Sequence, residues 1–299
     1  MTFTTVRPLR SRMADFQAGR LRGFCLANDA EYSEQDFVDM RSTGANVVRV
    51  PLHLTDSPPD LARVRQVLAW GARHDVRVMV VMCPLLNYWR DPVAQQALVS
   101  AWVNVACVFK SSPALQAYDI VNEPVNGADY SLATKTHWLS IAQVIATALR
   151  AADARTPIMV EPAWWGLPSS LWQTLPIKVT GLVYSFHFYE PQAYTHQGVG
   201  GRPEGVPLPA NTMLADMIDA KRFADLHSVP MFVGEFSCVR RAPGAAEWVA
   251  AAVSAFSAQG WGWTYHVWRG WEGWDAEMGS FNTRETSTLT LRALRLAAP

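Results

Sequence analysis

The 299-residue sequence predicts an α/β protein built as a single-domain (β/α)8 TIM barrel, on three observations. Short runs rich in β-branched residues alternate along the chain with longer segments of helical periodicity. The strand-like runs are nearly continuous in apolar residues, which is typical of parallel strands buried on both faces. Eight such β-then-α units favour a closed barrel over an open doubly wound sheet.

The predicted strands follow one another along the whole chain. They cover residues 21–27, 46–52, 76–82, 115–121, 157–161, 181–188, 230–236 and 261–268. The sixth strand is followed by a Gly/Pro-rich segment, residues 192–211, before the next helical pattern begins. We expect this segment to be a long loop on the face where the strands end, not a linker between domains.

Amphipathic helices are predicted between the strands. In residues 58–75, for example, Leu61, Val64 and Leu68 fall on one face of a 3.6-residue period. Similar patterns cover residues 33–44, 136–154, 216–228 and 245–260. The helix after the fifth strand is the weakest, because residues 164–176 are short and interrupted by proline. No internal repeat or linker divides the chain, so one catalytic domain is predicted over residues 1–299, with residues 1–18 leading into the barrel.

Composition restricts the class of partner. Hydrophobic residues make up 49% of the chain and charged residues 17%, which supports a sizeable core. Lys plus Arg and Asp plus Glu are both 26, so no net field attracts nucleic acid or an anionic membrane surface. The expected partner is therefore neutral or weakly charged, and we expect the chain to act as a monomer.

Cysteine spacing and the N-terminal segment give no sign of further features. Cys25, Cys83, Cys107 and Cys238 form no C-x-x-C pair and have no regular spacing, so we expect no disulfide framework, metal site or cofactor. Residues 1–16 lack the apolar run of a secretory signal, and no stretch reaches the roughly 18 apolar residues of a membrane span. The sequence as given predicts a soluble chain without an export signal and leaves its compartment open.

Polar and aromatic side chains are concentrated where the predicted strands end. In a barrel of this kind the carboxyl ends of the strands and the loops after them form the catalytic face. The residues at these ends are Asn28, Arg49, Asn122, Glu123, Glu161, Trp164, Trp165, His187, Tyr189, Glu190, Glu235 and Trp268. They are expected to converge on one rim.

Two of these residues, Glu123 and Glu235, predict the chemistry. They follow the apolar runs of the fourth and seventh strands, so they would face each other across the barrel mouth. Such a pair suits glycoside hydrolysis, in which one carboxyl group protonates the leaving oxygen while the other attacks the anomeric carbon or activates water. A single glutamate at a strand end is more often an ion-pair or helix-capping residue. The polar groups at the other strand ends favour the catalytic interpretation.

Four neighbours have predicted supporting roles. Arg49 would hydrogen-bond Glu235 and keep it ionised, and Tyr189 would donate its hydroxyl to the same carboxylate. Asn122 would contact the sugar 2-hydroxyl. His187 would hold or shuttle the proton of the acid. Taken singly, each of these side chains is ordinary: an arginine or tyrosine at a barrel mouth is structural about as often as functional, and an inward histidine is more often only a satisfied polar group.

Tryptophan is abundant, with 13 residues, and several lie in the predicted rim loops. Aromatic rings pack against the apolar faces of pyranose rings, so a tryptophan-lined groove fits a sugar polymer. Trp268, at the end of the eighth strand, is the predicted platform under the sugar next to the cleavage point. Trp164, Trp165, Trp271 and Asn28 are the other predicted substrate-binding residues.

These residues together resemble the retaining glycoside hydrolases of family 5, the cellulase-like family of the (β/α)8 glycosidase clan. The matching motifs are IVNEP at 120–124, FVGEF at 232–236, RGF near Arg22, ANVVRVP around Arg49, SFHFYEP around His187, and Trp268. The resemblance implies that Glu123 is the acid/base and Glu235 the nucleophile, and that anomeric configuration is retained through a covalent glycosyl-enzyme. Many members carry a histidine just after strand three, whereas this chain has MCPLLNYW at 82–89, with Cys83 or Asn87 in its place.

The predicted function is therefore a retaining glycosidase acting on a β-linked oligo- or polysaccharide, with an endo-β-1,4-glucanase preferred. A β-mannanase or another β-glycosidase of the family is the nearest alternative. An inactive carbohydrate-binding barrel is an alternative of another class. A barrel lyase or aldolase is disfavoured, because none of the strand ends carries a lysine.

Overall fold

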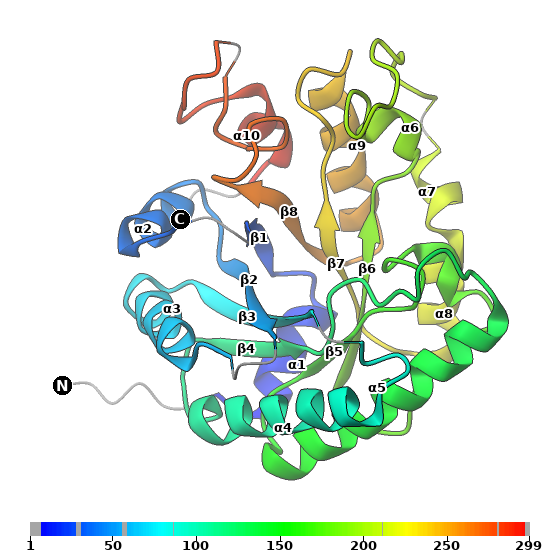
Figure 1. The fold of residues 1–299 in the computed structure, drawn as a ribbon. Helices are drawn as coiled ribbons and strands as arrows, with labels where there is room; N and C mark the ends of the chain where they lie inside the picture. The colour runs from blue at the N-terminus through cyan, green and yellow to red at the C-terminus, as the bar shows by residue number, and fades with distance from the viewer. Residues whose placement is uncertain are drawn as a thin grey trace.

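The computed structural model describes residues 7–27, 31–55, 59–85, 87–210, 212–279 and 281–296. Eight strands close into a barrel in sequence order, each parallel to its neighbours, and helices surround them (Figure 1). The strands are β1 Arg22–Leu26, β2 Val47–Leu54, β3 Arg77–Pro84, β4 Leu115–Asp119, β5 Ile158–Val160, β6 Leu182–Phe188, β7 Met231–Phe236 and β8 Gly262–Trp268. The predicted (β/α)8 barrel is confirmed. The assignment of the whole chain to one domain stays a prediction.

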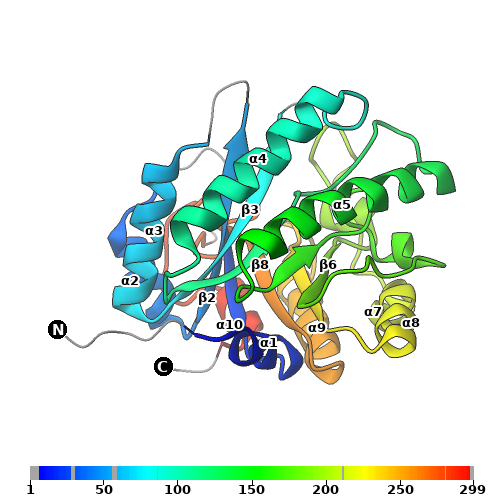
Figure 2. The same ribbon diagram turned by 90° about the horizontal axis from the view of Figure 1, so that it is seen from below.

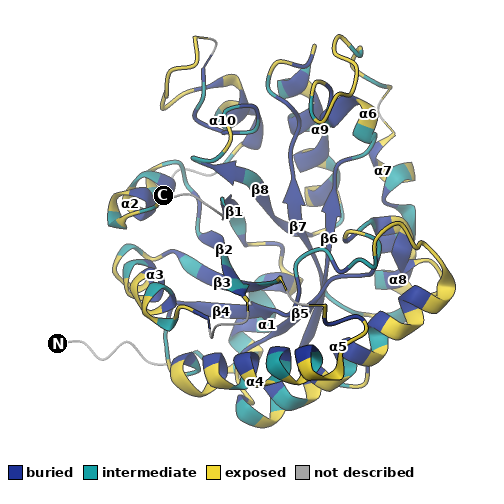
Figure 3. Ribbon diagram, in the orientation of Figure 1, coloured by how far each residue is buried: buried dark blue, intermediate teal, exposed yellow. Residues whose placement is uncertain are grey.

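All five predicted amphipathic segments are helical. The helices are α1 Leu9–Gln17, α2 Glu34–Ser42, α3 Leu61–His74, α4 Pro92–Phe109, α5 Leu132–Ala152, α6 Gln192–Thr195, α7 Met213–Asp216, α8 Ile218–His227, α9 Ala245–Ala258 and α10 Leu289–Leu294. The weak segment after β5 forms only a 3-10 turn, η1 Pro168–Leu171. Figure 3 shows the strands buried and the outward faces of the helices exposed, as expected for a barrel with an outer ring of helices.

Helix α4 lies in a region where no amphipathic segment is predicted, because its apolar residues are not confined to one side. Leu98 and Trp102 are buried, while Val93 is 76% exposed. Asp91 caps the helix by accepting from the backbone N–H of Val93, and Pro92 occupies the first turn. By length and composition it is the one helix in the described part of the chain that could cross a membrane, contrary to expectation. A core helix passes the same test: α4 packs against α5, and its Trp102 meets Tyr118 of β4 edge-on.

Alternate residues of the strands point into the barrel and form two layers of opposite character. The lower layer is apolar and comprises Phe16, Leu21, Val47, Met79, Ala117, Met159, Val183 and Phe232. The next inward position on several strands is polar or charged, as at Arg49, Asp119, Glu161 and Ser185. Because side chains alternate with a period of two, both sets share the inner face of the sheet.

Helix α1 covers the lower end of the barrel (Figure 2). Its Phe16 ring meets Phe232 of β7 edge-on at 5.7 Å between centroids. Arg12 is buried beside it and donates to the hydroxyl of Thr156 and to the carbonyl of Ser112. The predicted lead-in therefore contains a helix that completes the apolar layer.

The described strands show register shifts between β1 and β8, between β3 and β4, and between β6 and β7. The shifts at β6–β7 and β1–β8 decide the positions of Glu235 and Trp268. Between β6 and β7, Phe186 pairs with Val233 but His187 pairs with Glu235, so Gly234 is the extra residue of a bulge. A Cβ on Gly234 would lie 2.6 Å from Ser185 Oγ, so only glycine fits there. The bulge places Glu235 beside His187 at the carboxyl end of the barrel.

The second of these shifts lies between β1 and β8, where Phe24 pairs with Tyr265 but Leu26 pairs with Trp268. The additional residue on β8 turns Trp268 to the outer face, with Phe24 and Leu26. Trp268 is 1% exposed, packs on Phe24 at 4.8 Å, and donates its indole N–H to Asp36 of α2. The predicted role of Trp268 as a sugar platform is therefore wrong.

Candidate active site

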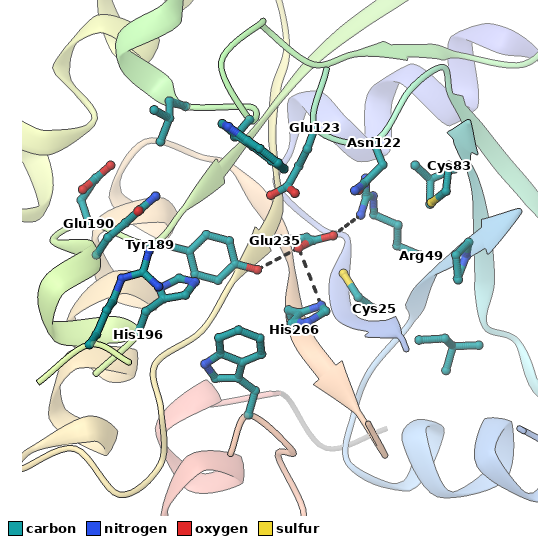
Figure 4. Close-up of a pocket in the computed structure, with 18 of the residues that line it drawn as sticks. Cys25, Arg49, Cys83, Asn122, Glu123, Tyr189, Glu190, His196, Glu235 and His266 are labelled. Atoms are coloured by element: carbon teal, nitrogen blue, oxygen red, sulfur yellow. Dashed lines mark hydrogen bonds and ion pairs between the residues drawn. The ribbon is translucent and has the colours of Figure 1, made fainter. Parts of the chain in front are cut away.

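A cavity of about 810 Å³ opens at the carboxyl ends of the strands (Figure 4). Its walls come from strands far apart in sequence, including Cys25 of β1, Arg49 of β2, Glu235 of β7 and His266 of β8. A second cavity of about 590 Å³ adjoins it, and both include Cys83, Asn122, Glu123 and Trp165 in their walls. Five of the six predicted catalytic residues line the larger cavity: Arg49, Asn122, Glu123, Tyr189 and Glu235. The sixth, His187, is buried and contacts Glu123.

Glu235 is held by two donors on opposite oxygens. Arg49 Nη1 donates to Oε1 at 2.6 Å, and the Tyr189 hydroxyl donates to Oε2 at 2.8 Å. Burial alone raises the pKa of Glu235, but the charges of His187 and Arg49 and the bond from Tyr189 outweigh it and lower the pKa below its usual value. Glu235 is therefore a carboxylate at neutral pH.

Glu123 lies in the turn that follows β4, which ends at Asp119, and its environment differs from that of Glu235. Its φ of 46° is in the left-handed region, and its backbone N–H donates to Glu161 Oε2 at 2.8 Å, which holds the chain in this turn. Burial raises the pKa of Glu123, as do the charges of Glu235 and Glu161, while the hydrogen bond with His187 at 2.9 Å lowers it. The net pKa is raised, so this carboxyl group retains a proton to higher pH than an exposed glutamate.

Arg49 is the centre of the charged layer. Besides Glu235, it donates from Nε to Asp119 at 2.8 Å and from Nη2 to Glu161 at 2.6 Å. It also donates to Asn122 Oδ1 at 2.9 Å, which fixes the amide and turns its NH2 group away from the arginine. Burial lowers the pKa of Arg49, but the neighbouring carboxylates raise it well above its usual value.

His187 connects the two glutamates. Its Nδ1 lies 2.9 Å from Glu123 Oε1 and 3.7 Å from Glu235 Oε2, and its Nε2 lies 3.2 Å from Glu161 Oε1. Burial lowers the pKa of His187, but the charges of Glu161 and Glu235 raise it well above the usual value. A cationic His187 stabilises the Glu235 carboxylate and donates toward Glu123.

The predicted substrate-binding residues divide into several groups. Trp165 is 44% exposed and lines both cavities. Trp164 packs against Tyr130, with Lys135 over its ring at 5.0 Å, and Trp271 packs edge-on against Trp274. The roles of these three tryptophans in sugar binding stay predictions. Asn28 lies outside the described residues.

The site also contains residues for which no catalytic or binding role was predicted. Cys25, His266 and Trp274 line its wall, and Asp119 and Glu161 lie beneath it as partners of Arg49. His266 could have been found from the alternation in β8, since the polar Thr264 and His266 occupy the same face of that strand. Trp274, one of the tryptophans of the predicted rim loops, follows β8 in a turn.

Two groups of side chains are close enough to share a metal ion. The ligand atoms of Cys25, Glu235 and His266 lie within 4.8 Å of one another, as do those of Glu123, His187 and Glu235. Neither group suits a cation well, because Glu235 already accepts from Arg49 and Tyr189 and because burial raises the pKa of the Cys25 thiol to about 12. The same atoms suit a reaction in which one carboxyl group is acidic and the other ionised.

Fold and carboxyl pair together are typical of the barrel glycosidases. Comparison with known proteins agrees, since residues 12–272 match the model of the family described as Cellulase (glycosyl hydrolase family 5). The chain therefore belongs to glycosyl hydrolase family 5.

Curated relatives are similar over only part of their length. Endoglucanase 3 of Fibrobacter succinogenes is 30% identical over 110 residues, which are 36% of this chain and 16% of that protein. Endoglucanase C of Acetivibrio thermocellus is 22% identical over 189 residues, which are 56% of this chain and 53% of that protein. The chain thus spans about half or less of the length of these relatives.

Solved structures share the fold over nearly the whole chain. A hyperthermophilic endo-β-1,4-glucanase in complex with substrate has a TM-score of 0.82 at 20% identity and covers 96% of this chain and 99% of its own. Thermotoga maritima Cel5A in complex with mannotriose has a TM-score of 0.82 at 19% identity, covering 94% and 99%. At sequence identities of 19% and 20%, the similarity to these structures shows a shared fold.

Proposed function

We propose that the protein is a retaining endo-β-1,4-glycanase that cleaves β-linked glucan by double displacement. The observation that carries this proposal is the pair of carboxyl groups at the barrel mouth. Oxygens of Glu123 and Glu235 lie within 4.8 Å of each other, and the pKa of the first is raised while that of the second is lowered. Retaining glycosidases place these groups about 5 to 5.5 Å apart, whereas inverting enzymes need about 6.5 to 9.5 Å.

The two steps follow from these protonation states. In the first, Glu235 attacks the anomeric carbon while Glu123 gives its proton to the departing glycosidic oxygen. In the second, the Glu123 carboxylate takes a proton from water, the water oxygen bonds to the anomeric carbon, and Glu235 leaves as a carboxylate. Arg49 and Tyr189 hold the nucleophile, and the Asn122 amide is free to donate to the sugar 2-hydroxyl.

Endo action is supported by the shape of the site. The cavities of about 810 and 590 Å³ share Glu123 in their walls, so space for sugars extends beyond the catalytic pair along more than one wall of the barrel mouth. Tyr88 and Trp89 line the smaller cavity and Trp274 the larger, which offers aromatic surface to sugar rings in each. A chain bound across both cavities would be cut internally.

Glucan is preferred because the curated relatives are named endoglucanases. Mannan is the second candidate, since one structural neighbour was solved with mannotriose. Viscosity loss and product sizing on carboxymethyl cellulose, barley β-glucan, glucomannan and xylan would separate these substrates and distinguish endo from exo action. Fast viscosity loss with a spread of oligosaccharides is expected on a β-1,4-glucan.

The decisive test is Glu235→Ala, compared with Glu247→Ala on the exposed face of α9 as a matched control. Loss of the nucleophile should lower turnover by about 10⁴-fold or more, while the control keeps it. NMR of the first product should show the β-anomer. Near-full activity of Glu235→Ala would refute the proposal, and an initial α-anomer would refute retention. Oligosaccharide binding without any product from the wild type would favour an inactive binding barrel.

A further inference from the structure

His266 of β8 lies beside the nucleophile Glu235. It lines the larger cavity, and its ring meets Trp274 at 5.5 Å between centroids. Its Nδ1 lies 3.7 Å from Glu235 Oε2, which is beyond hydrogen-bond length (Figure 4). This nitrogen is buried and has no hydrogen-bond partner among the described residues. A buried polar nitrogen without a partner, directed at a reacting carboxylate, calls for a functional explanation.

The groups around His266 determine its protonation state and its tautomer. Burial lowers the pKa of His266, and the charges of His187 and Arg49 lower it further, against the opposing effect of Glu235. The ring is therefore neutral at neutral pH and carries one N–H. Because Nδ1 faces a carboxylate oxygen, the tautomer with the proton on Nδ1 is favoured over one that points a lone pair at that oxygen.

The two oxygens of Glu235 are used differently. Oε1 accepts the short bond from Arg49, whereas Oε2 accepts from Tyr189 and has both histidine Nδ1 atoms at 3.7 Å. Oε2 is thus the oxygen that is placed to bond to the anomeric carbon of the sugar. When it bonds to the anomeric carbon it loses its charge, and when that bond breaks the electron pair returns to it. A donor that approaches Oε2 at that moment stabilises the departing carboxylate.

We propose that His266 is a positioning residue for the nucleophile, whose Nδ1–H closes on Glu235 Oε2 as the glycosyl-enzyme is hydrolysed. This inference rests on the proposed retaining mechanism. A donor to the carboxylate stabilises the free nucleophile, which is the reactant of the first step and the product of the second. Its removal therefore slows the second step and leaves the first little changed or slightly faster.

Three substitutions separate this role from simple packing. His266→Phe keeps a ring against Trp274 and removes both nitrogens. His266→Asn places an amide N–H near the position of Nδ1, whereas His266→Gln places it near Nε2. His227→Phe, on α8 and outside the larger cavity, is the matched control for replacing a histidine by phenylalanine.

The experiment measures how fast a trapped glycosyl-enzyme forms and how fast it is hydrolysed. Each protein is incubated with 2,4-dinitrophenyl 2-deoxy-2-fluoro-β-cellobioside, labelling is followed by mass spectrometry, and the rate of reactivation is measured after the reagent is removed. We expect normal labelling of all variants, reactivation about tenfold or more slower in His266→Phe and His266→Gln, and near-wild-type reactivation in His266→Asn and the control. On 2,4-dinitrophenyl β-cellobioside, kcat and KM should fall together in His266→Phe, with kcat/KM within about threefold of wild type.

Other outcomes overturn the inference. If His266→Phe labels slowly but reactivates normally, or if His266→Asn is as impaired as His266→Phe, the residue acts in binding or packing and not on the leaving carboxylate. If the wild type itself is never labelled, the retaining mechanism fails and this inference falls with it. Circular dichroism and thermal melting of each variant exclude misfolding as the cause of a slow rate.

Discussion

The lower and upper layers of the barrel interior differ in character although the same strands build both. Val47 and Arg49 lie two residues apart on β2, and Met159 and Glu161 lie two apart around the end of β5. The lower residue of each pair joins an apolar cluster closed by α1, whereas the upper one joins a network of buried charges. The contrast indicates that one end of each strand stabilises the fold while the other end serves the chemistry.

Burying the charged groups of the upper layer costs desolvation free energy, but their positive and negative charges nearly balance. Arg49 and cationic His187 face the carboxylates of Glu161 and Glu235, while burial raises the pKa of Asp119 to about 7 although Arg49 opposes the rise. Buried charges are tolerated only when each has partners, and truncation of one leaves another uncompensated. The residues of the upper layer are therefore explained by the reaction that they support more than by a contribution to folding stability.

Glu123→Ala should produce the largest effect among the tests of this contrast, and only on catalysis. Loss of the general acid lowers kcat/KM by about 10²- to 10⁴-fold on cellooligosaccharides, whose leaving groups need a proton. The loss should be much smaller for a dinitrophenyl cellobioside, which leaves without protonation, and added azide should restore turnover through a glycosyl azide. Equal losses on the two substrates would show that Glu123 is not the acid.

Phe16→Ala should produce the opposite result, because Phe16 lies in the lower layer at 1% exposure and packs on Phe232. Loss of the ring leaves a cavity and should lower the free energy of unfolding by about 3 to 5 kcal/mol in urea titrations. In buffer well below the melting transition, kcat/KM should stay within about twofold of wild type. A tenfold fall in kcat/KM under these conditions would mean that the two layers are coupled.

Periodicity and strand ends predict much of this division from sequence. The eight strands, the five amphipathic helices and the position of the Glu123 and Glu235 motifs follow from local patterns, because strand period and strand ends are local properties. The partners of Arg49 are only partly visible in this way. Glu161 is recognised as a strand-end residue, but its contacts with Arg49 and His187 depend on barrel closure.

The sequence patterns do not determine the pairing register between neighbouring strands. Trp268 ends a predicted strand, yet one additional residue between the pairs Phe24–Tyr265 and Leu26–Trp268 turns it outward. A one-residue shift exchanges the two faces of a strand, so a local pattern cannot place a side chain beyond a bulge. The same shift explains why His266 and not Trp268 faces the nucleophile.

Replacing Glu123 by Gln should have a smaller effect on how activity depends on pH. Activity of the wild type should rise with the ionisation of Glu235, whose pKa is lowered, and fall as Glu123, whose pKa is raised, loses its proton. On cellooligosaccharides, whose leaving groups need a proton, the alkaline limb of kcat/KM should be absent in Glu123→Gln. An unchanged alkaline limb would assign it to another group.

The same two pKa shifts should make folding stability depend on pH, with opposite directions for Glu123 and Glu235. Since the folded pKa of Glu123 lies above the unfolded value of about 4.3, its contribution is fully present below that pH and is lost as pH rises through the folded pKa. Glu235 has a lowered pKa, so its contribution is present above about 4.3 and is lost as pH falls. Melting temperatures of Glu123→Gln relative to wild type should therefore rise with pH above about 4.3. A constant difference would contradict the raised pKa of Glu123.

Trp165→Ala should give the smallest change, because this side chain is 44% exposed at the rim and belongs to neither layer. It lines both cavities, so its ring is placed to contact a sugar near the cleavage point. Loss of one stacking contact of about 0.5 to 1.5 kcal/mol should raise KM for cellotetraose and longer chains by about 2- to 12-fold, with kcat little changed. Trp172→Ala, which removes a 52% exposed tryptophan outside both cavities, is the matched control and should leave KM unchanged. Equal KM values for Trp165→Ala and the control would show that the rim at Trp165 does not contact the substrate.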